Sequence, residues 1–310
     1  MDAPSEPAAA PPAEREGDFE LCTLRSGARA VRHVGHGEVM HPAGGPWEEA
    51  NRLYVDQPQL AARLRAARRP VCVFDIGLGA ATNAVAALAC ARQAGGALEL
   101  HSFELDLAPL RLALRDPGGF PFLAEYREAA QALLSCGRWQ QGDLRWVLHR
   151  GDVLDCLAAA PPSAELIFYD PFSPQHNPAL WTAAAFAAVR ARCHGDGALL
   201  LTYSAATPMR AALLLGGFYV GAGVPTGTKR ETTVGATHLA SLAAPLGARW
   251  LARWERSSAR APLGETELTA AREREIRTHP QFTGAAAQPP VADPRPAADP
   301  RGPHEPTRDV

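Results

Sequence analysis

The sequence predicts an α/β protein with a doubly wound, mostly parallel sheet that carries helices on both faces. Two observations support this prediction. Between residues 71 and 215, short apolar runs alternate with helical segments, which is the pattern of successive βαβ units. In addition, four of the expected strands end at an acidic residue. Ligands of such sheets bind at the carboxyl ends of the strands, so these acidic residues indicate one binding edge.

The first half of this pattern contains two expected strands. Residues 71–77 form a short β-rich run that ends in glycine, and an Ala/Leu helix is expected over 82–93. A second strand is indicated over 97–105, followed by a short helix over 109–115. Another helix is expected over 123–137, which returns the chain to the sheet.

The second half contains three expected strands. The third strand is indicated over residues 144–152. The fourth, over 164–170, has four consecutive apolar or aromatic residues, as expected for a strand that is covered on both faces. A helix over 182–193 leads to a fifth strand over 197–204, and a last helix over 206–215 ends at a Gly-Gly turn.

Composition limits the class of protein. A net charge of −2 over 310 residues does not indicate a protein that binds nucleic acid through bulk electrostatics. The six cysteines form no C-x-x-C pair, so we expect buried free thiols and no metal site. The N-terminus lacks the pattern of a signal peptide, and the longest apolar run, around 84–91, is too short to cross a bilayer. These features predict a cytoplasmic protein.

Three regions are expected along the chain. Residues 1–17 and 281–310 are rich in Pro and Ala and lack periodicity, so we expect both tails to be disordered. Residues 18–280 are expected to form one domain, because the alternating strand and helix patterns lie inside this range.

The turn after the first strand favours S-adenosylmethionine as the cofactor. Asp75, Gly77 and Gly79 lie there, where glycines let the backbone approach a ligand and the next helix offers free N–H groups. A dinucleotide would require G-x-G-x-x-G, but Thr82 occupies the third glycine position. Asp75 would also repel a pyrophosphate, whereas it would attract the ammonium and sulfonium of S-adenosylmethionine.

Two further acidic residues extend this cofactor hypothesis. Glu104 closes the second strand about where a ribose-binding acid belongs, and Asp152 follows the third strand, where it could meet the adenine amino group. Taken singly, an acidic residue after a strand is more often a turn or helix cap. Three such residues on three successive strands favour a ligand site.

The fourth strand leads into the proline-rich segment YDPFSPQHNPALWT, which begins with Asp170 after the tyrosine. Prolines stiffen a loop and so help to fix side chains near a reacting group. The alternative is a rigid loop in which Asp170 is a cap and Trp181 is a core residue. From these residues alone, both interpretations remain open.

The same segment resembles the D-G-F-A-P-x-x-N-P-x-x-W motif of the MnmC-like methyltransferase domain family, which forms 5-methylaminomethyl-2-thiouridine in tRNA. The matching residues are Asp170, Phe172, Pro174, Asn177, Pro178 and Trp181. Upstream, HPAGGPWEEANRLYV resembles the family pattern H-S-x-x-G-A-x-x-E-S-x-x-V-F-I at His41, Gly45 and Glu49. The glycine loop agrees as well, and includes Asn83.

A fourth stretch, TGTKRETT, resembles the family's G-R-K-R-E-M at Lys229, Arg230 and Glu231. Lys229 is the only lysine of the chain, and arginine does not imitate lysine at a tight site, which argues against a chance match. The alternative is a solvated basic pair after a strand. The whole resemblance covers about residues 25–240.

The resemblance implies a Rossmann-like class I methyltransferase fold and methyl transfer to the aminomethyl group of a modified wobble uridine in tRNA. The catalytic residues that it implies are Asp170, Phe172 and Asn177. The implied cofactor-binding residues are Asp75, Gly77, Gly79, Asn83, Glu104, Asp152 and Glu49. The implied substrate-binding residues are His41, Trp181, Lys229 and Arg230. Because the charge pattern alone does not indicate RNA, tRNA as partner depends on the resemblance.

The sequence also departs from the family. Position 171 is proline where the family has glycine, Ser173 replaces an alanine, and no region of the size of the family's FAD-dependent oxidase domain follows residue 280. These departures concern the acceptor and leave the cofactor prediction intact. Two alternatives therefore remain: a methyl or aminopropyl transferase that acts on a small amine, and a non-catalytic Rossmann-like binding module.

Overall fold

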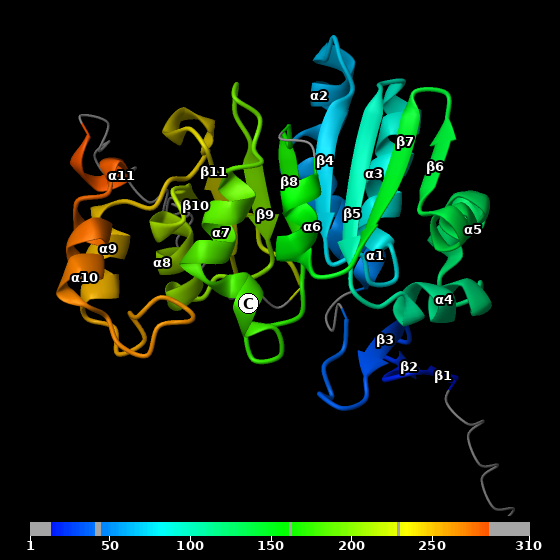
Figure 1. Ribbon diagram of the computed structural model, residues 1–310, viewed down its shortest axis with the longest axis horizontal. Helices are drawn as coiled ribbons and strands as arrows, with labels where there is room; N and C mark the ends of the chain where they lie inside the picture. The colour runs from blue at the N-terminus through cyan, green and yellow to red at the C-terminus, as the bar shows by residue number, and fades with distance from the viewer. Residues whose placement is uncertain (1–13, 41–44, 161–162, 228–229, 285–310) are drawn as a thin grey trace, which may run out of the picture.

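The computed structural model describes residues 14–40, 45–160, 163–227 and 230–284, and its centre is one eight-stranded sheet (Figure 1). The strand order is β10-β11-β9-β8-β4-β5-β7-β6. The five parallel strands are β4 (Val71–Ile76), β5 (Leu98–Glu104), β7 (Leu144–Arg150), β8 (Leu166–Tyr169) and β9 (Leu199–Thr202). All five predicted strands are therefore confirmed, as is the mostly parallel α/β fold.

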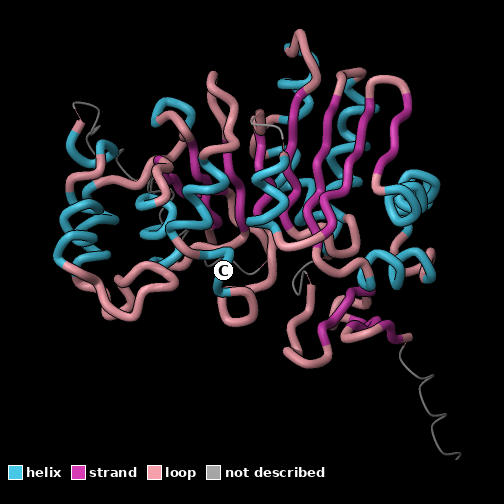
Figure 2. The backbone as a smooth tube through the Cα atoms, viewed as in Figure 1, coloured by secondary structure: helices cyan, strands magenta, loops and turns pink. Residues whose placement is uncertain are grey.

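Helices cover both faces of the sheet because its central strands are apolar on both sides. Along β4, Val71 and Val73 face one core, whereas Cys72 and Phe74 face the other. Figures 1 and 2 show α3 behind the sheet, and α6 and α7 in front of it. The helices packed on the first core are α1 (Pro46–Ala50), η1 (Asn51–Asp56), α2 (Leu60–Ala66), α3 (Thr82–Ala94), α4 (Ala108–Arg115), η2 (Pro121–Tyr126) and α5 (Arg127–Cys136).

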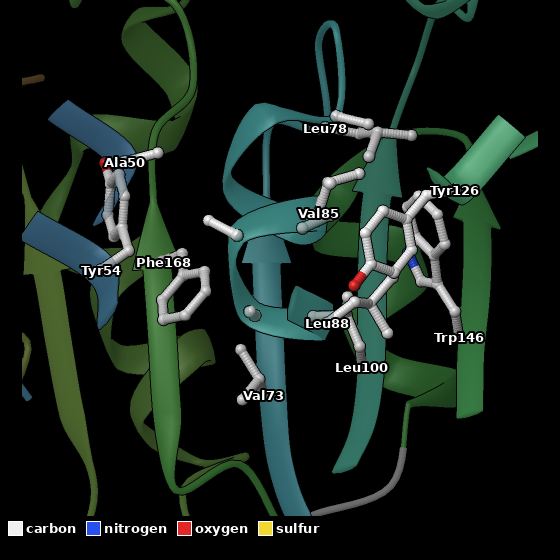
Figure 3. Packing of buried hydrophobic residues seen from close by; sticks show 14 of the residues in the cluster. Ala50, Tyr54, Val73, Leu78, Val85, Leu88, Leu100, Tyr126, Trp146 and Phe168 are labelled. Atoms are coloured by element: carbon white, nitrogen blue, oxygen red, sulfur yellow. The ribbon is translucent and has the colours of Figure 1, made fainter. Parts of the chain in front are cut away.

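The second core lies under the helices that follow β7. These helices are α6 (Val153–Ala159), η3 (Pro178–Trp181), α7 (Ala183–Arg190), α8 (Thr207–Leu215), α9 (Ala248–Glu255) and α10 (Ala270–Arg277). The helices predicted over 82–93, 109–115, 182–193 and 206–215 are confirmed, but the one predicted over 123–137 is divided into a 3₁₀-helix and α5. Figure 3 shows how the first core packs, with the rings of Tyr126 and Trp146 beside Leu88 and Leu100.

Antiparallel strands at both edges of the sheet were not predicted. At one edge, β6 (Arg138–Gln141) forms a hairpin with β7. At the other edge, β10 (Tyr219–Gly223) pairs with β11 (Thr232–Ala236), and β11 pairs antiparallel with β9. The β10–β11 connection carries Arg230 to the carboxyl end of β9.

A small antiparallel sheet near the N-terminus was also not predicted. Its strands are β1 (Arg15–Glu16), β2 (Phe19–Thr23) and β3 (Arg29–His33). Figure 1 shows it below the lower edge of the main sheet, where the parallel strands end. Because Phe19, Leu21 and Val31 are buried in the first core, this sheet is part of the same folded unit.

The folded region extends beyond the predicted limits at both ends. Strand β1 lies inside the predicted tail 1–17, and helix α11 (Pro280–Thr283) enters the predicted tail 281–310. Gln281 is buried: its side-chain oxygen accepts from Val220 N at 2.7 Å, and its nitrogen donates to Leu246 O at 2.7 Å. A side chain that bonds to strand β10 explains why a polar segment is ordered. Residues 1–13 and 285–310 of the two predicted tails lie outside the described part of the chain.

All six cysteines are free thiols, as predicted, but only Cys72 and Cys90 are buried, while Cys136 is exposed and the other three are partly exposed. Burial raises the pKa of the Cys72 thiol to about 12, so this group is neutral at physiological pH. Across the described segments, none of the helices has the length and apolar character required to span a membrane.

Candidate functional site

A cavity of about 480 Å³ opens at the carboxyl ends of the parallel strands, as the acidic strand ends predict. It lies between the glycine loop after β4, the loop after β8, helix α1 and the segment that follows β3. The predicted site residues that line it are Glu49, Gly77, Gly79, Glu104, Asp152, Asp170, Phe172 and Asn177. Residues far apart in the sequence therefore meet at one edge of the sheet.

The glycine loop packs tightly against the loop after β8. Gly77 has φ +92°, and a Cβ at this position would lie 2.6 Å from the carbonyl oxygen of Asp170. Only glycine combines this backbone conformation with such a close approach. The two loops that are predicted to hold cofactor and acceptor are thus in direct contact.

Glu104 holds the other side of the glycine loop. Its carboxylate accepts from Gly79 N at 3.0 Å, from Leu105 N at 2.8 Å and from Asp106 N at 3.1 Å. Burial raises the pKa of Glu104 despite these three donors. Because a carboxylate offers about four acceptor positions, Glu104 retains capacity for a hydroxyl donor in the cavity.

Asp75 does not line the cavity. It lies inside β4, fully buried, and its carboxylate accepts from the Ser102 hydroxyl at 2.7 Å. Trp146 Nε1 donates to the same hydroxyl at 2.9 Å. The observed contacts of Asp75 therefore join β4 to β5 and β7, and a direct contact with a cofactor stays a prediction.

Asp152 caps helix α6 and also lines the cavity. Its Oδ1 accepts from Leu154 N at 2.8 Å, which is the geometry of an N-cap. The capping alternative that the sequence leaves open is thus present, and it occupies only one of the two carboxylate oxygens of this cavity residue.

Asp170 follows β8 and is held by Asn83. The Asn83 amide nitrogen donates to Asp170 Oδ2 at 2.8 Å. Asn83 is buried at the start of α3 and is not part of the cavity lining, although the sequence predicts that it binds the cofactor. Its observed contact instead fixes the orientation of the predicted catalytic carboxylate.

Trp181 requires a correction. The sequence predicts that it binds substrate, but its side chain is 0 % exposed and lies in the second core, behind residues that line the cavity. Its ring packs edge-on against Tyr169 and Tyr203, and its Nε1 donates to Phe172 O at 2.8 Å. A large apolar ring with one polar atom is suited to this role, because it anchors the loop that carries Phe172.

Glu38, which the sequence analysis did not identify, closes the cavity from the N-terminal side. It accepts from the Ser173 N–H at 3.0 Å and from the Ser173 hydroxyl at 2.8 Å, and it contacts His176. Burial opposes ionisation of Glu38, but these donors together hold its pKa below the usual value. The serine that replaces the family's alanine therefore binds the N-terminal segment to the loop after β8.

The wall of the cavity also includes Glu49, Tyr54 and Tyr203, of which only Glu49 was predicted. Glu49 accepts from the Thr226 hydroxyl at 3.0 Å, and Tyr203 donates to Pro171 O at 3.3 Å. Burial, together with the negative charge of Asp170, raises the pKa of Tyr203. Tyr203 lies outside the motifs that resemble the family, whereas Tyr54 lies inside the stretch HPAGGPWEEANRLYV, at a position where the family pattern has phenylalanine.

Arg230 is exposed and lies outside the cavity. With Ser204 and Glu231 it lines a shallow depression that shares Tyr203 with the cavity. Arg210, whose side chain is 1 % exposed, donates to Glu231 at 3.1 Å and so fixes the segment next to Arg230. The predicted residues His41 and Lys229 lie outside the described residues.

Comparison with known proteins agrees with this geometry. Residues 123–238 match the family model described as S-adenosyl-L-methionine-dependent methyltransferase. The bifunctional tRNA 5-methylaminomethyl-2-thiouridine biosynthesis protein MnmC of Ectopseudomonas mendocina is 30% identical over 234 residues, which is 70% of this chain and 35% of that protein. The MnmC protein of Hahella chejuensis is 31% identical over 205 residues, 62% of this chain and 32% of that one. This chain is an S-adenosyl-L-methionine-dependent methyltransferase related to the MnmC proteins.

The methyltransferase spans about a third of the length of these curated relatives. Its fold is shared with MNMC2 from Aquifex aeolicus, with a TM-score of 0.65 and 22% identity over 87% of this chain and 86% of that one. The predicted Rossmann-like methyltransferase fold is therefore confirmed.

The residues of the cavity fit S-adenosylmethionine. Gly77 and Gly79 provide a backbone surface without side chains, beside the N-terminus of α3. Two carboxylates lie at the ends of β5 and β7, from Glu104 and Asp152. Two more come from Asp170, which follows β8, and from Glu49 in α1. A ligand with ribose hydroxyls at one end and positive charge at the other matches this distribution.

Proposed function

We propose that this methyltransferase methylates the primary amine of an aminomethyl group on a modified wobble uridine of tRNA, in the cytoplasm. The position of Asp170 carries the proposal: its carboxylate lines the cavity, is oriented by Asn83, and stands next to the cofactor loop. The name of the MnmC relatives, which refers to 5-methylaminomethyl-2-thiouridine in tRNA, supports the choice of acceptor.

Asp170 has two tasks in the proposed reaction. S-adenosylmethionine supplies a methyl group on sulfur, whose C–S bond breaks as the C–N bond to the acceptor forms. An alkylammonium has a pKa of about 10, so presenting the neutral amine at pH 7 costs about 4 kcal/mol. Asp170 by itself raises the pKa of a nearby amine, so its main task is to hold and align the nitrogen. It then receives the proton released by the methylated nitrogen, directly or through water.

The other residues position the two reactants. In the proposal, Glu104 accepts from the ribose and Asp152 from the adenine amino group, while Asp75, Gly77 and Gly79 shape the loop between them. Phe172 and Asn177 form the wall next to Asp170. Holding the reactants in an aligned geometry is the largest contribution that such a site makes to a bimolecular transfer.

Arg230 is the described residue that best suits a phosphate of tRNA. It is exposed and lies in the depression that adjoins the cavity at Tyr203. Arg29 and Arg69, by contrast, are held in ion pairs, with Asp116 at 2.9 Å and with Glu165 at 2.7 Å. In the proposal, Arg230 therefore provides the salt-sensitive contact to the RNA backbone.

Methyl transfer from labelled S-adenosylmethionine to tRNA tests the proposal. The tRNA comes from cells that lack the terminal wobble-uridine methylation. We expect incorporation with the wild-type protein, its loss in Asp170→Asn, and no change in Asp155→Asn, which alters an exposed aspartate on α6. Both variants are expected to bind S-adenosylhomocysteine normally. Incorporation into small primary amines but not into tRNA would refute tRNA as acceptor and retain the methyltransferase.

A further inference from the structure

The cavity contains one buried hydroxyl that has no hydrogen-bond partner among the described residues. This hydroxyl belongs to Tyr54, whose side chain is 1 % exposed and lines the cavity. The ring packs against Phe168 with centroids 5.0 Å apart, and Figure 3 shows the two rings side by side, with the tyrosine oxygen at the end away from its backbone. Buried polar atoms are almost always bonded, so an unsatisfied one at a cavity indicates a contact made by a ligand.

The local backbone sets Tyr54 apart from the rest of the wall. It lies in the π-helix η1 (Asn51–Asp56), which directly follows α1 with Glu49. A π-helical turn is rare and occurs frequently at functional sites. Because Glu49 and Tyr54 both line the cavity, α1 and η1 together present a carboxylate and a hydroxyl to the same ligand.

The surroundings of Tyr54 indicate which end of the cavity it serves. Burial and the negative charges of Asp170 and Glu49 raise the pKa of Tyr54, so its hydroxyl is neutral. Its ring lies over β8, whereas Glu104 and Asp152 follow β5 and β7. Tyr54 is therefore on the side of Asp170, away from the carboxylates assigned to the adenosine. A neutral phenol oxygen in the same cavity as Asp170 and Glu49 is able to accept from an N–H group.

We propose that the Tyr54 hydroxyl binds the acceptor nitrogen. This inference rests on the proposed amine methylation. A neutral primary amine has two N–H bonds and one lone pair. When Asp170 accepts one N–H and the Tyr54 oxygen accepts the other, the lone pair is left for the bond to carbon. Tyr54 thus selects an acceptor with two N–H donors and fixes the direction from which its nitrogen reacts.

The test is Tyr54→Phe, which removes only the oxygen. A single neutral hydrogen bond corresponds to about a tenfold change in rate, so we expect kcat/KM for the aminomethyl acceptor to fall about tenfold. Affinity for S-adenosylhomocysteine should stay within about twofold, and Tm should be unchanged or higher because an unsatisfied buried hydroxyl has been removed.

Tyr126→Phe is the matched control. The Tyr126 hydroxyl is also buried without a hydrogen-bond partner among the described residues, but its ring packs in the first core and does not line the cavity (Figure 3). We expect Tyr126→Phe to have the same effect on Tm as Tyr54→Phe and none on methyl transfer. A purely structural role for Tyr54 would make the two variants kinetically alike.

Two results would overturn the inference. Wild-type kinetics in Tyr54→Phe would show that the hydroxyl makes no contact with the acceptor. An equal loss of S-adenosylhomocysteine affinity and of activity would assign the hydroxyl to the cofactor. Both results differ from a failure of the proposed function, in which the wild-type protein itself would not methylate the aminomethyl uridine.

Discussion

Replacing Gly77 by alanine is expected to destabilise the protein more than the same replacement at another left-handed glycine. Gly95, after α3, has φ +71° and nothing within 4 Å of an added Cβ, so Gly95→Ala meets only the backbone penalty. That penalty is about 1–2 kcal/mol. At Gly77 the added Cβ would also lie 2.6 Å from Asp170 O, a backbone atom that no side-chain rotation can move.

The loop after β8 must therefore shift in Gly77→Ala. Overpacking of this kind costs about 1–3 kcal/mol in addition to the backbone penalty. For a domain of this size each kcal/mol lowers Tm by about 2–4 °C, so Gly77→Ala should melt about 2–12 °C below Gly95→Ala. Because Asp170 moves with the loop, methyl transfer should fall in Gly77→Ala and stay near wild type in Gly95→Ala.

Thermal unfolding and S-adenosylhomocysteine binding, measured on both variants and the wild type, check this reasoning. Equal Tm values for the two variants would refute it, since the close approach of the loops after β4 and β8 would then contribute nothing to stability. A Gly77→Ala protein with lowered Tm but full activity would separate the packing of the loop from the position of Asp170.

Three further predictions concern other contacts of the fold. Asn83→Ala should lower kcat about tenfold by releasing Asp170, with cofactor affinity unchanged, as measured by single-turnover transfer and calorimetry. Burial and the neighbouring His101 lower the pKa of His149 to about 4, so the unfolded chain gains a proton between pH 6.5 and 4 that the folded protein does not. The free energy of unfolding should therefore decrease as the pH is lowered from 6.5 to 4. Urea titrations should show a smaller decrease in His149→Gln over the same pH range. Gln281→Ala should lower the free energy of unfolding by about 1–3 kcal/mol, because it leaves polar groups of β10 unsatisfied; an unchanged urea midpoint would contradict this.

The parallel half of the fold could be predicted because its strands are locally distinct. Runs such as Leu166–Tyr169 are fully buried and apolar, and the helices between them are rich in Ala and Leu. The antiparallel edges carry no such signal: Thr232–Ala236 is short and contains Gly235, and Arg138–Gln141 is mostly exposed and polar. They become strands because a neighbouring strand offers hydrogen bonds, which is a property of the tertiary structure.

The residues of the candidate site likewise divide into those that the sequence predicts and those that it does not. Gly77, Glu104 and Asp170 follow strands, and the rule that ligands bind at strand ends was sufficient to place them in one cavity. Glu38 comes from the N-terminal segment, where nothing nearby in the sequence indicates the cavity. Tyr54 lies in the same motif as Glu49, but the family pattern has phenylalanine at its position, so the motif did not indicate a hydroxyl there.

A match to a family motif does not distinguish a residue that binds a ligand from one that packs in the core. Trp181 matches the motif as closely as Asp170, yet the motif does not reveal which side chain faces a ligand and which one packs beneath the loop. The structure places the tryptophan ring in the core, where its large apolar area is buried.

The contact of Gln281 with β10 has a consequence for the behaviour of the protein at high concentration. Strand β10 is the last strand of the sheet, and an uncovered last strand can pair with another chain. The amide of Gln281 bonds to both backbone groups of Val220, and Ala244 and Leu246 bond to the backbone of the same strand. This amide therefore acts as a short substitute for a ninth strand. The segment around Ala244 and Leu246 covers the same edge, so loss of α11 would remove the two amide bonds at Val220 and leave the edge covered in part. We therefore expect the C-terminal helix to limit edge-to-edge pairing as well as unfolding.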